Sequence, residues 1–248
     1  MRNLIVGADI GQAIDPTAIV LAESYRPEQI YVDSIPDAEM LVRWIERVPL
    51  GTSYSEVVDR IARVGEAAQV YGNVTTVLDA TGVGRPVVEM LKRRSSIPLR
   101  AVTFSAGSVV TKTDPYSYVV PKRDLVTALE VLLQGRRIHV TPDLALAQDM
   151  RAELMAFEVG VSARGHDAYE AASGHHDDLV MALALCAWWA GQPSSGQTFL
   201  DYWRLGSVLR CPRRPDGHLW GDGRCVACNL VRNVRPQSIH EIQEVSSQ

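Results

Sequence analysis

The sequence predicts an α/β domain in which helices cover a mixed β-sheet. Two apolar runs at residues 3–10 and 17–24 read as strands, and the turn signal Asp15-Pro16 between them predicts a hairpin. Residues 74–140 then alternate between strand and helix patterns. A hairpin followed by strand–helix–strand units is typical of a mixed sheet flanked by helices.

The other elements follow from hydrophobic periodicity and turn residues. We expect a third strand within residues 39–48 and a helix over 55–71 that carries its small and apolar side chains on one face. Beyond these we expect strands over 74–79, 99–104 and 137–140, and helices over 84–94, 121–134, 144–157 and 178–190.

Composition limits the classes of function. The chain has 248 residues, 46% of them hydrophobic and 22% charged, which fits one globular domain with a small appendage. Its net charge of −4 gives no bulk attraction to nucleic acid, so DNA binding would need local basic patches. No run is long and apolar enough to span a bilayer, and we expect no signal peptide. The four cysteines do not indicate a disulfide framework.

The chain divides into three parts by composition. Residues 1–191 contain every predicted core element. Residues 192–209 begin with the linker-like run Gln192-Pro193-Ser194-Ser195-Gly196. Residues 210–248 form a short tail that is rich in turn residues.

Acidic residues lie at the ends of three separate elements. Asp9 ends the first strand, Asp79 ends the strand over 74–79, and Asp177-Asp178 opens the last helix. We expect strands 3–10 and 74–79 to lie side by side, with the helix start supplying the third acid. Clustered carboxylates repel one another unless a cation binds them, and oxygen ligands suit Mg²⁺ or Mn²⁺. Two such ions about 4 Å apart promote phosphodiester hydrolysis.

Each acid also has a purely structural interpretation. Asp9 can bind backbone N–H groups of its own turn, and Asp79 can belong to an ordinary strand-to-helix turn. The Asp177-Asp178 pair can be a simple helix cap, because acids are favourable at helix N-termini. The joint occurrence and order of the three acidic positions favour the metal site.

Four motifs together resemble the nuclease domain of the terminase large subunit of tailed phages. The resemblance covers residues 1–191. It rests on Gly7-Ala8-Asp9-Ile10-Gly11 with Asp15-Pro16-Thr17-Ala18, Asp79-Ala80-Thr81-Gly82-Val83-Gly84, Val120-Pro121-Lys122-Arg123-Asp124-Leu125 and His176-Asp177-Asp178-Leu179-Val180.

The resemblance implies an RNase H-like (retroviral integrase-type) fold and an endonuclease that cuts double-stranded DNA with two Mg²⁺ or Mn²⁺ ions. It places the catalytic and metal-binding roles on Asp9, Asp79, Asp177 and Asp178, with Asp178 favoured as the main third ligand. It also implies work in the host cytoplasm with a packaging ATPase, a small terminase subunit and a portal. The chain departs from a full large subunit because it has no Gly-x-x-x-x-Gly-Lys-Ser/Thr loop, so we expect no ATP hydrolysis by this polypeptide.

Several other residues are candidates for supporting roles. Lys122 and Arg123 lie at the start of a predicted helix, where they can contact a DNA phosphate or form a solvated helix start. His175 and His176 flank the acids, where one of them can transfer a proton or orient a metal ligand, although a loop histidine commonly does neither. Glu153 can face the site from a nearby helix, but a surface ion pair is the favoured interpretation.

The tail contains a candidate structural zinc site. Its residues Cys211, His218, Cys225 and Cys228 have the spacing Cys-x6-His-x6-Cys-x2-Cys. A tail this short cannot build a core, so Zn²⁺ would supply its folding energy. The alternative is a tail with free thiols. Cys186, inside the last core helix, is expected to be a buried apolar residue.

Other functions remain open from the sequence. One is a Holliday-junction resolvase of related fold, and another is a non-catalytic module that binds DNA or the packaging motor. A sugar-kinase-like or actin-like ATPase also opens with a strand and an Asp-x-Gly, but it gives the Asp177-Asp178 helix start no role.

Overall fold

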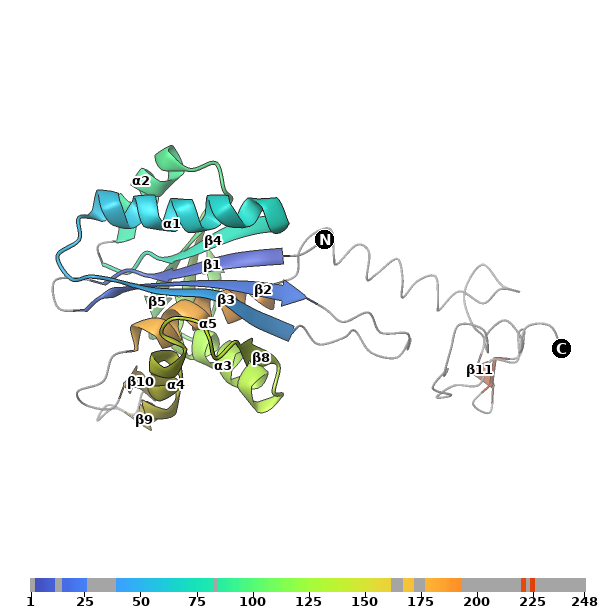
Figure 1. The fold of residues 1–248 in the computed structure, drawn as a ribbon. Coiled ribbons are helices and arrows are strands. Elements are labelled where there is room, and N and C mark those ends of the chain that lie inside the picture. Colours follow the sequence, from blue (N-terminus) through green and yellow to red (C-terminus); the bar gives the residue numbers. More distant parts are fainter. Residues whose placement is uncertain are drawn as a thin grey trace. The chain divides into compact units, whose positions relative to one another are not determined.

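A computed structural model describes residues 3–11, 15–25, 39–82, 84–161, 167–171, 177–192, 220–221 and 224–225. The chain forms two compact units, the first made of residues 1–25 and 38–191 and the second of residues 26–37 and 192–248. Among the described residues, all helices and all but two short strands belong to the first unit (Figure 1). The short strands, β11 (Trp220–Gly221) and β12 (Arg224–Cys225), pair with each other in the second unit.

The first unit is built on an eight-stranded mixed sheet with the order β6-β7-β5-β4-β1-β2-β3-β8. Strands β1, β2 and β3 form an antiparallel meander, while β4, β5 and β7 run parallel to β1. The strands are β1 (Asn3–Asp9), β2 (Thr17–Tyr25), β3 (Glu39–Val48), β4 (Asn73–Asp79), β5 (Leu99–Ser105), β6 (Thr111–Lys112), β7 (Ser117–Pro121) and β8 (Ile138–Val140).

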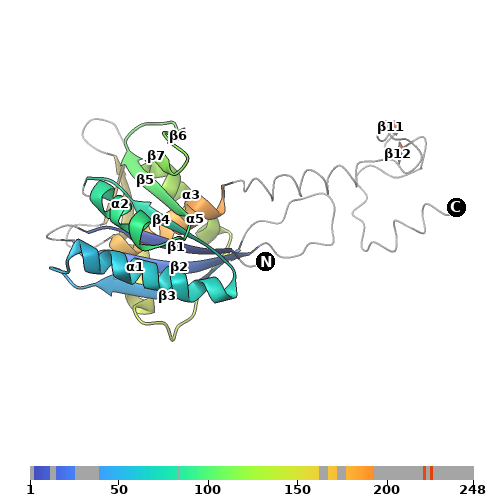
Figure 2. The same cartoon turned by 90° about the horizontal axis from the view of Figure 1, so that it is seen from above.

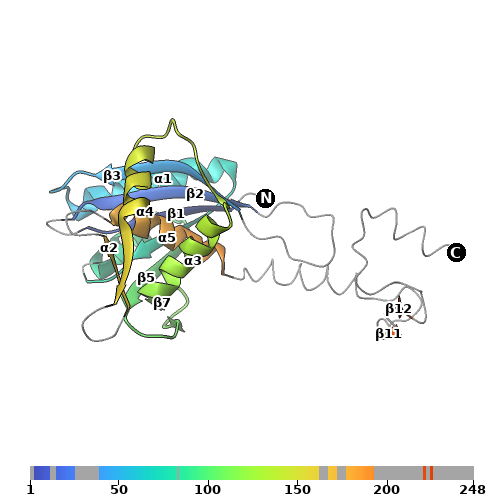
Figure 3. The ribbon, with the colours of Figure 1, turned by 90° about the horizontal axis from the view of Figure 1, so that it is seen from below.

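Helices cover both faces of this sheet. The helices α1 (Tyr54–Ala68) and α2 (Gly84–Arg94) pack on one face (Figure 2). The opposite face carries α3 (Lys122–Gln134), α4 (Ala147–Ala156) and α5 (Asp178–Ala190) (Figure 3). We call these the α1 face and the α5 face. Each face has its own apolar core.

The predicted helices form for the expected reasons. Helix α1 buries the face that contains Val58, Ile61 and Ala62, and Ser53 caps it by accepting a hydrogen bond from the Glu56 N–H at 3.3 Å. A one-turn 3₁₀ helix, Gln69–Tyr71, extends it. Helix α5 is apolar on all sides because it is buried between the sheet and the other helices of its face. Within the described residues, the helices are all too short or too polar to cross a membrane.

The sequence-based assignment differs from the structure in several places, among them the short strands β6, β11 and β12, which it did not predict. It missed β7, whose last residue, Pro121, was assigned to the following helix. It missed the hairpin of β9 (Phe157–Val161) and β10 (Asp167–Ala171). It also began α4 three residues early. A five-residue strand that ends in proline gives little periodic signal, and proline is common in the first turn of helices.

Candidate active site

Asp9 and Asp79 lie at the ends of neighbouring parallel strands. The pairing of Ala8 with Leu78 puts both carboxyl groups at the same edge of the sheet. Side chains alternate along a strand, and Ile5 and Val77 belong to the core of the α5 face. Asp9 and Asp79 follow them at even spacing, so both acids point to the α5 face. The expected approach of the two strands is confirmed.

Gly7 allows α5 to lie directly on β1. A Cβ atom on Gly7 would overlap the backbone carbonyl oxygen of Ala182 and would come within 2.6 Å of the Cys186 sulfur. The Cys186 thiol contacts the carbonyl oxygens of Ile5 and Val20 at 3.6 and 3.7 Å, so it is a buried packing residue as expected. This close contact brings the first turn of α5 to the edge that carries Asp9.

Asp79 is fixed by the turn that follows it. The Thr81 N–H donates a hydrogen bond to its Oδ1 at 2.8 Å, and Gly82 provides the left-handed conformation of the turn with φ +67°. Burial raises the pKa of the Asp79 carboxyl group, although hydrogen bonds from Thr81 act in the opposite direction. The turn interpretation of this acid therefore holds.

Asp9 has the more strongly perturbed carboxyl group. Burial raises its pKa well above the usual value, and the charges of Asp79 and Asp177 raise it further. The interaction between the two side chains also raises the pKa of Asp9 and lowers that of Asp79. Carboxylates that repel one another this strongly need either a shared proton or a bound cation.

Asp177 precedes α5 with a half-buried side chain. It occupies the N-cap position but its side chain makes no capping hydrogen bond. Its Oδ2 instead lies 3.3 Å from the ammonium nitrogen of Lys122, the first residue of α3. The simple-cap interpretation therefore does not describe Asp177, and the structure brings Lys122 to the acids.

Asp178 is held by an arginine that the sequence did not indicate. The Arg47 Nε donates to Asp178 Oδ2 at 2.8 Å, and Nη2 lies 3.2 Å from Oδ1. Arg47 Nη2 also binds Glu153 Oε1. Only 3% of Asp178 and 7% of Glu153 is exposed. The favoured interpretation of Glu153 as part of a surface ion pair was wrong, because its carboxylate is buried and faces the half-buried Arg47.

Arg47 gives no local signal in the sequence, because it is one charged residue near the end of a strand. Its neighbours Asp178 and Glu153 lie more than 100 positions away in the chain. Only the packing of β3, α4 and α5 brings the three together.

The acids differ in their present partners. No group of three or more His, Cys, Asp or Glu side chains is positioned to hold a metal ion within the described part of the chain. Asp9 and Asp79 bind each other, Asp177 binds Lys122, and Asp178 binds Arg47. All four offer only carboxylate oxygens, the donor type that hard divalent cations prefer.

Some predicted residues contribute less or lie outside the described residues. Arg123 is exposed; it donates to the Ser108 carbonyl oxygen at 3.2 Å and to Asp124 at 3.3 Å. His175, His176, Cys211, His218 and Cys228 lie outside the described residues, as does the side chain of Cys225. The structure gives no support to the zinc site, which stays a prediction.

The sheet order and the acids at its edge define the class of this protein. It is an α/β domain consistent with the RNase H-like nuclease fold, in which acids from separate elements meet at the carboxyl ends of parallel strands.

The proteins similar to this chain include phage terminase large subunits and their nuclease domains. No family model matches the chain. The terminase large subunit of Thermus phage G20c is 26% identical over 180 residues, which cover 67% of this chain and 33% of that protein. The crystal structure of the large terminase nuclease from phage G20c with bound magnesium matches with a TM-score of 0.52 at 24% identity, over 75% of this chain and 80% of that one. The same nuclease with bound cobalt gives the same values.

The resemblance to the terminase large subunit is therefore confirmed. The curated relatives are terminase large subunits, and the fold is that of a large-terminase nuclease domain. The chain spans about a third of the length of these curated relatives.

Proposed function

We propose that this chain is a metal-dependent endonuclease that cuts double-stranded DNA during phage genome packaging. The observation that carries the proposal is the arrangement of Asp9, Asp79 and the Asp177-Asp178 pair at one edge of the sheet. Three distant segments of the chain place acids there, although their mutual repulsion opposes folding.

The comparisons support the same reaction class. The large terminase nuclease from phage G20c has been crystallised with magnesium and with cobalt, and its fold matches this chain. A divalent metal fits the donor set here, because the acids supply hard oxygen ligands and a strong local negative charge.

The proposed ligands are Asp9, Asp79 and Asp177, with Asp178 beside them. Two Mg²⁺ or Mn²⁺ ions held there would activate a water and stabilise the leaving oxygen in phosphodiester hydrolysis. Asp177 replaces Asp178 as the favoured third ligand, because Asp178 faces Arg47 with both oxygens while Asp177 has the stronger effect on the pKa of Asp9.

Basic residues beside the acids would position the substrate. Lys122 lies next to Asp177, and Arg123 is exposed one residue further along α3. We propose that they bind DNA phosphates, which orient a duplex without reading its sequence. Such local contacts are needed because the net charge of −4 disfavours DNA binding overall.

The proposed setting is the host cytoplasm. The partners would be double-stranded DNA, a packaging ATPase, a small terminase subunit and a portal. The spacing of the tail cysteines would place a structural Zn²⁺ in residues 210–248.

Nicking of supercoiled plasmid tests the proposed activity. We expect cleavage with Mg²⁺ or Mn²⁺, none with EDTA, and a loss of at least about 100-fold in Asp9→Asn and Asp79→Asn, since changes to residues that merely support metal ligands already cost about 10–100-fold. Asp59→Asn is the control, because Asp59 is an exposed acid on α1 that pairs with Arg94.

The result that would contradict the proposal is DNA binding without cleavage in either metal. Such a result would support a non-catalytic module. A strong preference for four-way junctions over linear duplex would replace the packaging role with junction resolution.

A further inference from the structure

A β-bulge determines which face of the sheet Arg47 occupies. Leu21 of β2 pairs with Trp44, but the next residue, Ala22, pairs with Val42, so Arg43 is an extra residue in β3. Val42 and Ile45 both belong to the core of the α5 face. Without the bulge, strict alternation from Val42 would direct Arg47 to the α1 face.

The bulge therefore places the guanidinium of Arg47 on the α5 face, beside the acids at the edge of the sheet. Arg47 binds three carboxylate oxygens there, two from Asp178 and one from Glu153. A planar guanidinium can bridge two carboxylates in this way, whereas a lysine ammonium acts as a point charge. Asp178 is thereby held by a residue of β3. Lys122 follows β7, which lies on the other side of β1 in the strand order.

Glu153 performs a second task at the same place. Its Oε2 accepts a hydrogen bond at 3.1 Å from the backbone N–H of Leu179, in the first turn of α5. This N–H has no partner within its own helix, so α4 caps α5 from outside. Neither acid of the Asp177-Asp178 pair has to serve as the cap for this N–H group.

We propose that Arg47 and Glu153 are positioning residues for the active site. Together they hold Asp178 and the first turn of α5, so that Asp177 is the member of the pair that meets Asp9 and Asp79. This inference rests on the proposed metal-dependent function and adds two residues to it. Neither residue touches the metal or DNA in this role.

An alternative role for Arg47 predicts the opposite change in metal affinity. If Arg47 were a latch that has to release Asp178 before metal binds, its removal would strengthen metal binding. If it is a positioning residue, its removal weakens metal binding, because changes to the partners of metal ligands typically cost about 10–100-fold in affinity.

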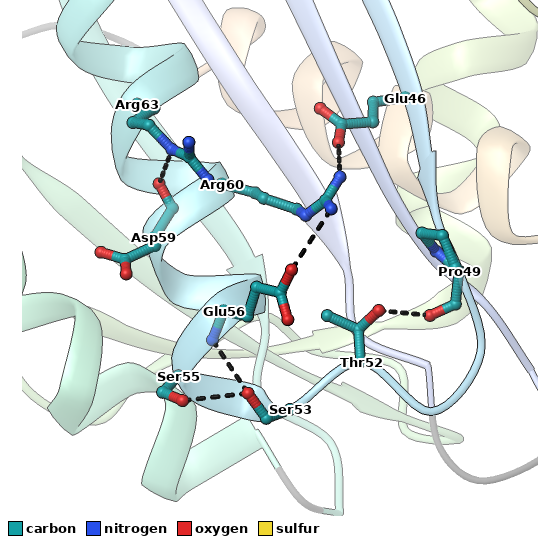
Figure 4. A network of polar contacts seen from close by, with 9 residues as sticks. All are labelled: Glu46, Pro49, Thr52, Ser53, Ser55, Glu56, Asp59, Arg60 and Arg63. Carbon is teal, nitrogen blue, oxygen red and sulfur yellow. Dashed lines mark hydrogen bonds and ion pairs between the residues drawn. The ribbon is translucent and has the colours of Figure 1, made fainter.

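The opposite face of the sheet offers a matched control. Arg60 of α1 also bridges two carboxylates, with Nη1 2.7 Å from Glu46 Oε1 and Nη2 3.4 Å from Glu56 Oε1 (Figure 4). Its side chain is 30% exposed, compared with 23% for Arg47. Substitution of Arg60 therefore removes a similar ion pair on the α1 face of the sheet, where the acids do not point.

The experiment measures Mn²⁺ affinity, nicking and stability in parallel. Free Mn²⁺ is counted by electron paramagnetic resonance in the full chain and in Arg47→Lys, Arg47→Met, Glu153→Gln, Arg60→Lys and Arg60→Met. We expect the Arg47 and Glu153 variants to bind Mn²⁺ about 10–100-fold more weakly, with nicking that recovers at high Mn²⁺. We expect the Arg60 variants to keep the Mn²⁺ affinity of the unchanged chain, even if their melting temperatures fall as much as those of the Arg47 variants.

Glu153→Gln and Arg47→Lys keep the inference testable if Arg47→Met does not fold. Arg47 and Leu179 donate to different oxygens of Glu153, and glutamine replaces one of these oxygens with an NH₂ group that cannot accept, so one of the two hydrogen bonds is lost. Unchanged or tighter Mn²⁺ binding in the folded Arg47 and Glu153 variants would overturn the inference, and so would equal weakening in the Arg60 variants.

Failure of the proposed function gives a separate result. An unchanged chain that binds Mn²⁺ but never nicks DNA would refute the nuclease, while the affinities of the variants would still decide the positioning role. An unchanged chain that does not bind Mn²⁺ would overturn both.

Discussion

Asp9 and Asp79 face each other across two parallel strands, with Asp177 and Asp178 at the adjacent helix start. Charges gathered in this way oppose folding and favour binding, because a cation removes the repulsion that the fold imposes. A site of this kind should show a trade-off between stability and function. Individual substitutions can measure it.

The first prediction concerns the dependence of stability on pH. The folded pKa of Asp9 is raised, so between its unfolded value of about 3.9 and the folded value the native state binds more protons than the unfolded state. The free energy of unfolding therefore falls as pH rises through this window. In EDTA at neutral pH, Asp9→Asn should melt above the unchanged chain, by about 2–4 °C for each kcal/mol of repulsion removed.

The pH dependence of the difference is the check on its cause. The gap in melting temperature should shrink as pH falls through about 4, because below the unfolded pKa the aspartate is protonated in both states. A gap that is constant with pH would assign the effect to packing.

The second prediction concerns the buried thiol. Burial raises the pKa of Cys186 to about 12, so almost no thiolate is present at pH 8. We expect iodoacetamide to leave Cys186 unmodified in the folded protein and to label it after unfolding in urea, as measured by peptide mass spectrometry. Rapid labelling under native conditions would show that α5 does not stay on the sheet.

At the scale of elements, the contact between α5 and β1 is the feature on which the site depends. Helix α5 lies against β1 where Gly7 has no side chain, and its first turn is held by Arg47 from β3 and Glu153 from α4. The position of the Asp177-Asp178 pair thus depends on two sets of contacts. One is the packing of α5 on β1 at Gly7, and the other is the hold of Arg47 and Glu153 on the first turn of α5.

Gly7→Ala tests that interface. The added methyl group meets a backbone carbonyl, which cannot move unless α5 moves as a whole. We expect a loss of about 1–3 kcal/mol in the free energy of unfolding, measured with urea, together with reduced nicking. Gly107→Ala is the control: its Cβ would lie 3.5 Å from the Ser105 hydroxyl, so a change within about 0.5 kcal/mol is expected.

At the scale of the whole molecule, the eight-stranded sheet and all the described acids of the site belong to the unit formed by residues 1–25 and 38–191. This unit ends at Gly191. The role of residues 192–248 in activity is tested by removing them.

A chain that ends at residue 191 addresses it. We expect its melting temperature to stay within about 2 °C of the full chain and its plasmid nicking to persist, because the core elements are all retained. Zinc measured by atomic absorption should be present in the full chain and absent from the shorter one. Loss of nicking would show that the tail takes part in cleavage, and zinc in the shorter chain would contradict the tail site.

The sequence by itself determined the mixed sheet, the apolar central helix and the placement of Asp9, Asp79 and the Asp177-Asp178 pair at the ends of elements. These features depend on periodicity and turn residues that are local in the chain. The tertiary structure alone decided that Arg47 turns to the acids, that Glu153 caps α5 and that Asp178 faces Arg47. Those outcomes depend on strand register and on contacts between segments more than 100 residues apart, where one extra residue in β3 reverses the face a side chain occupies.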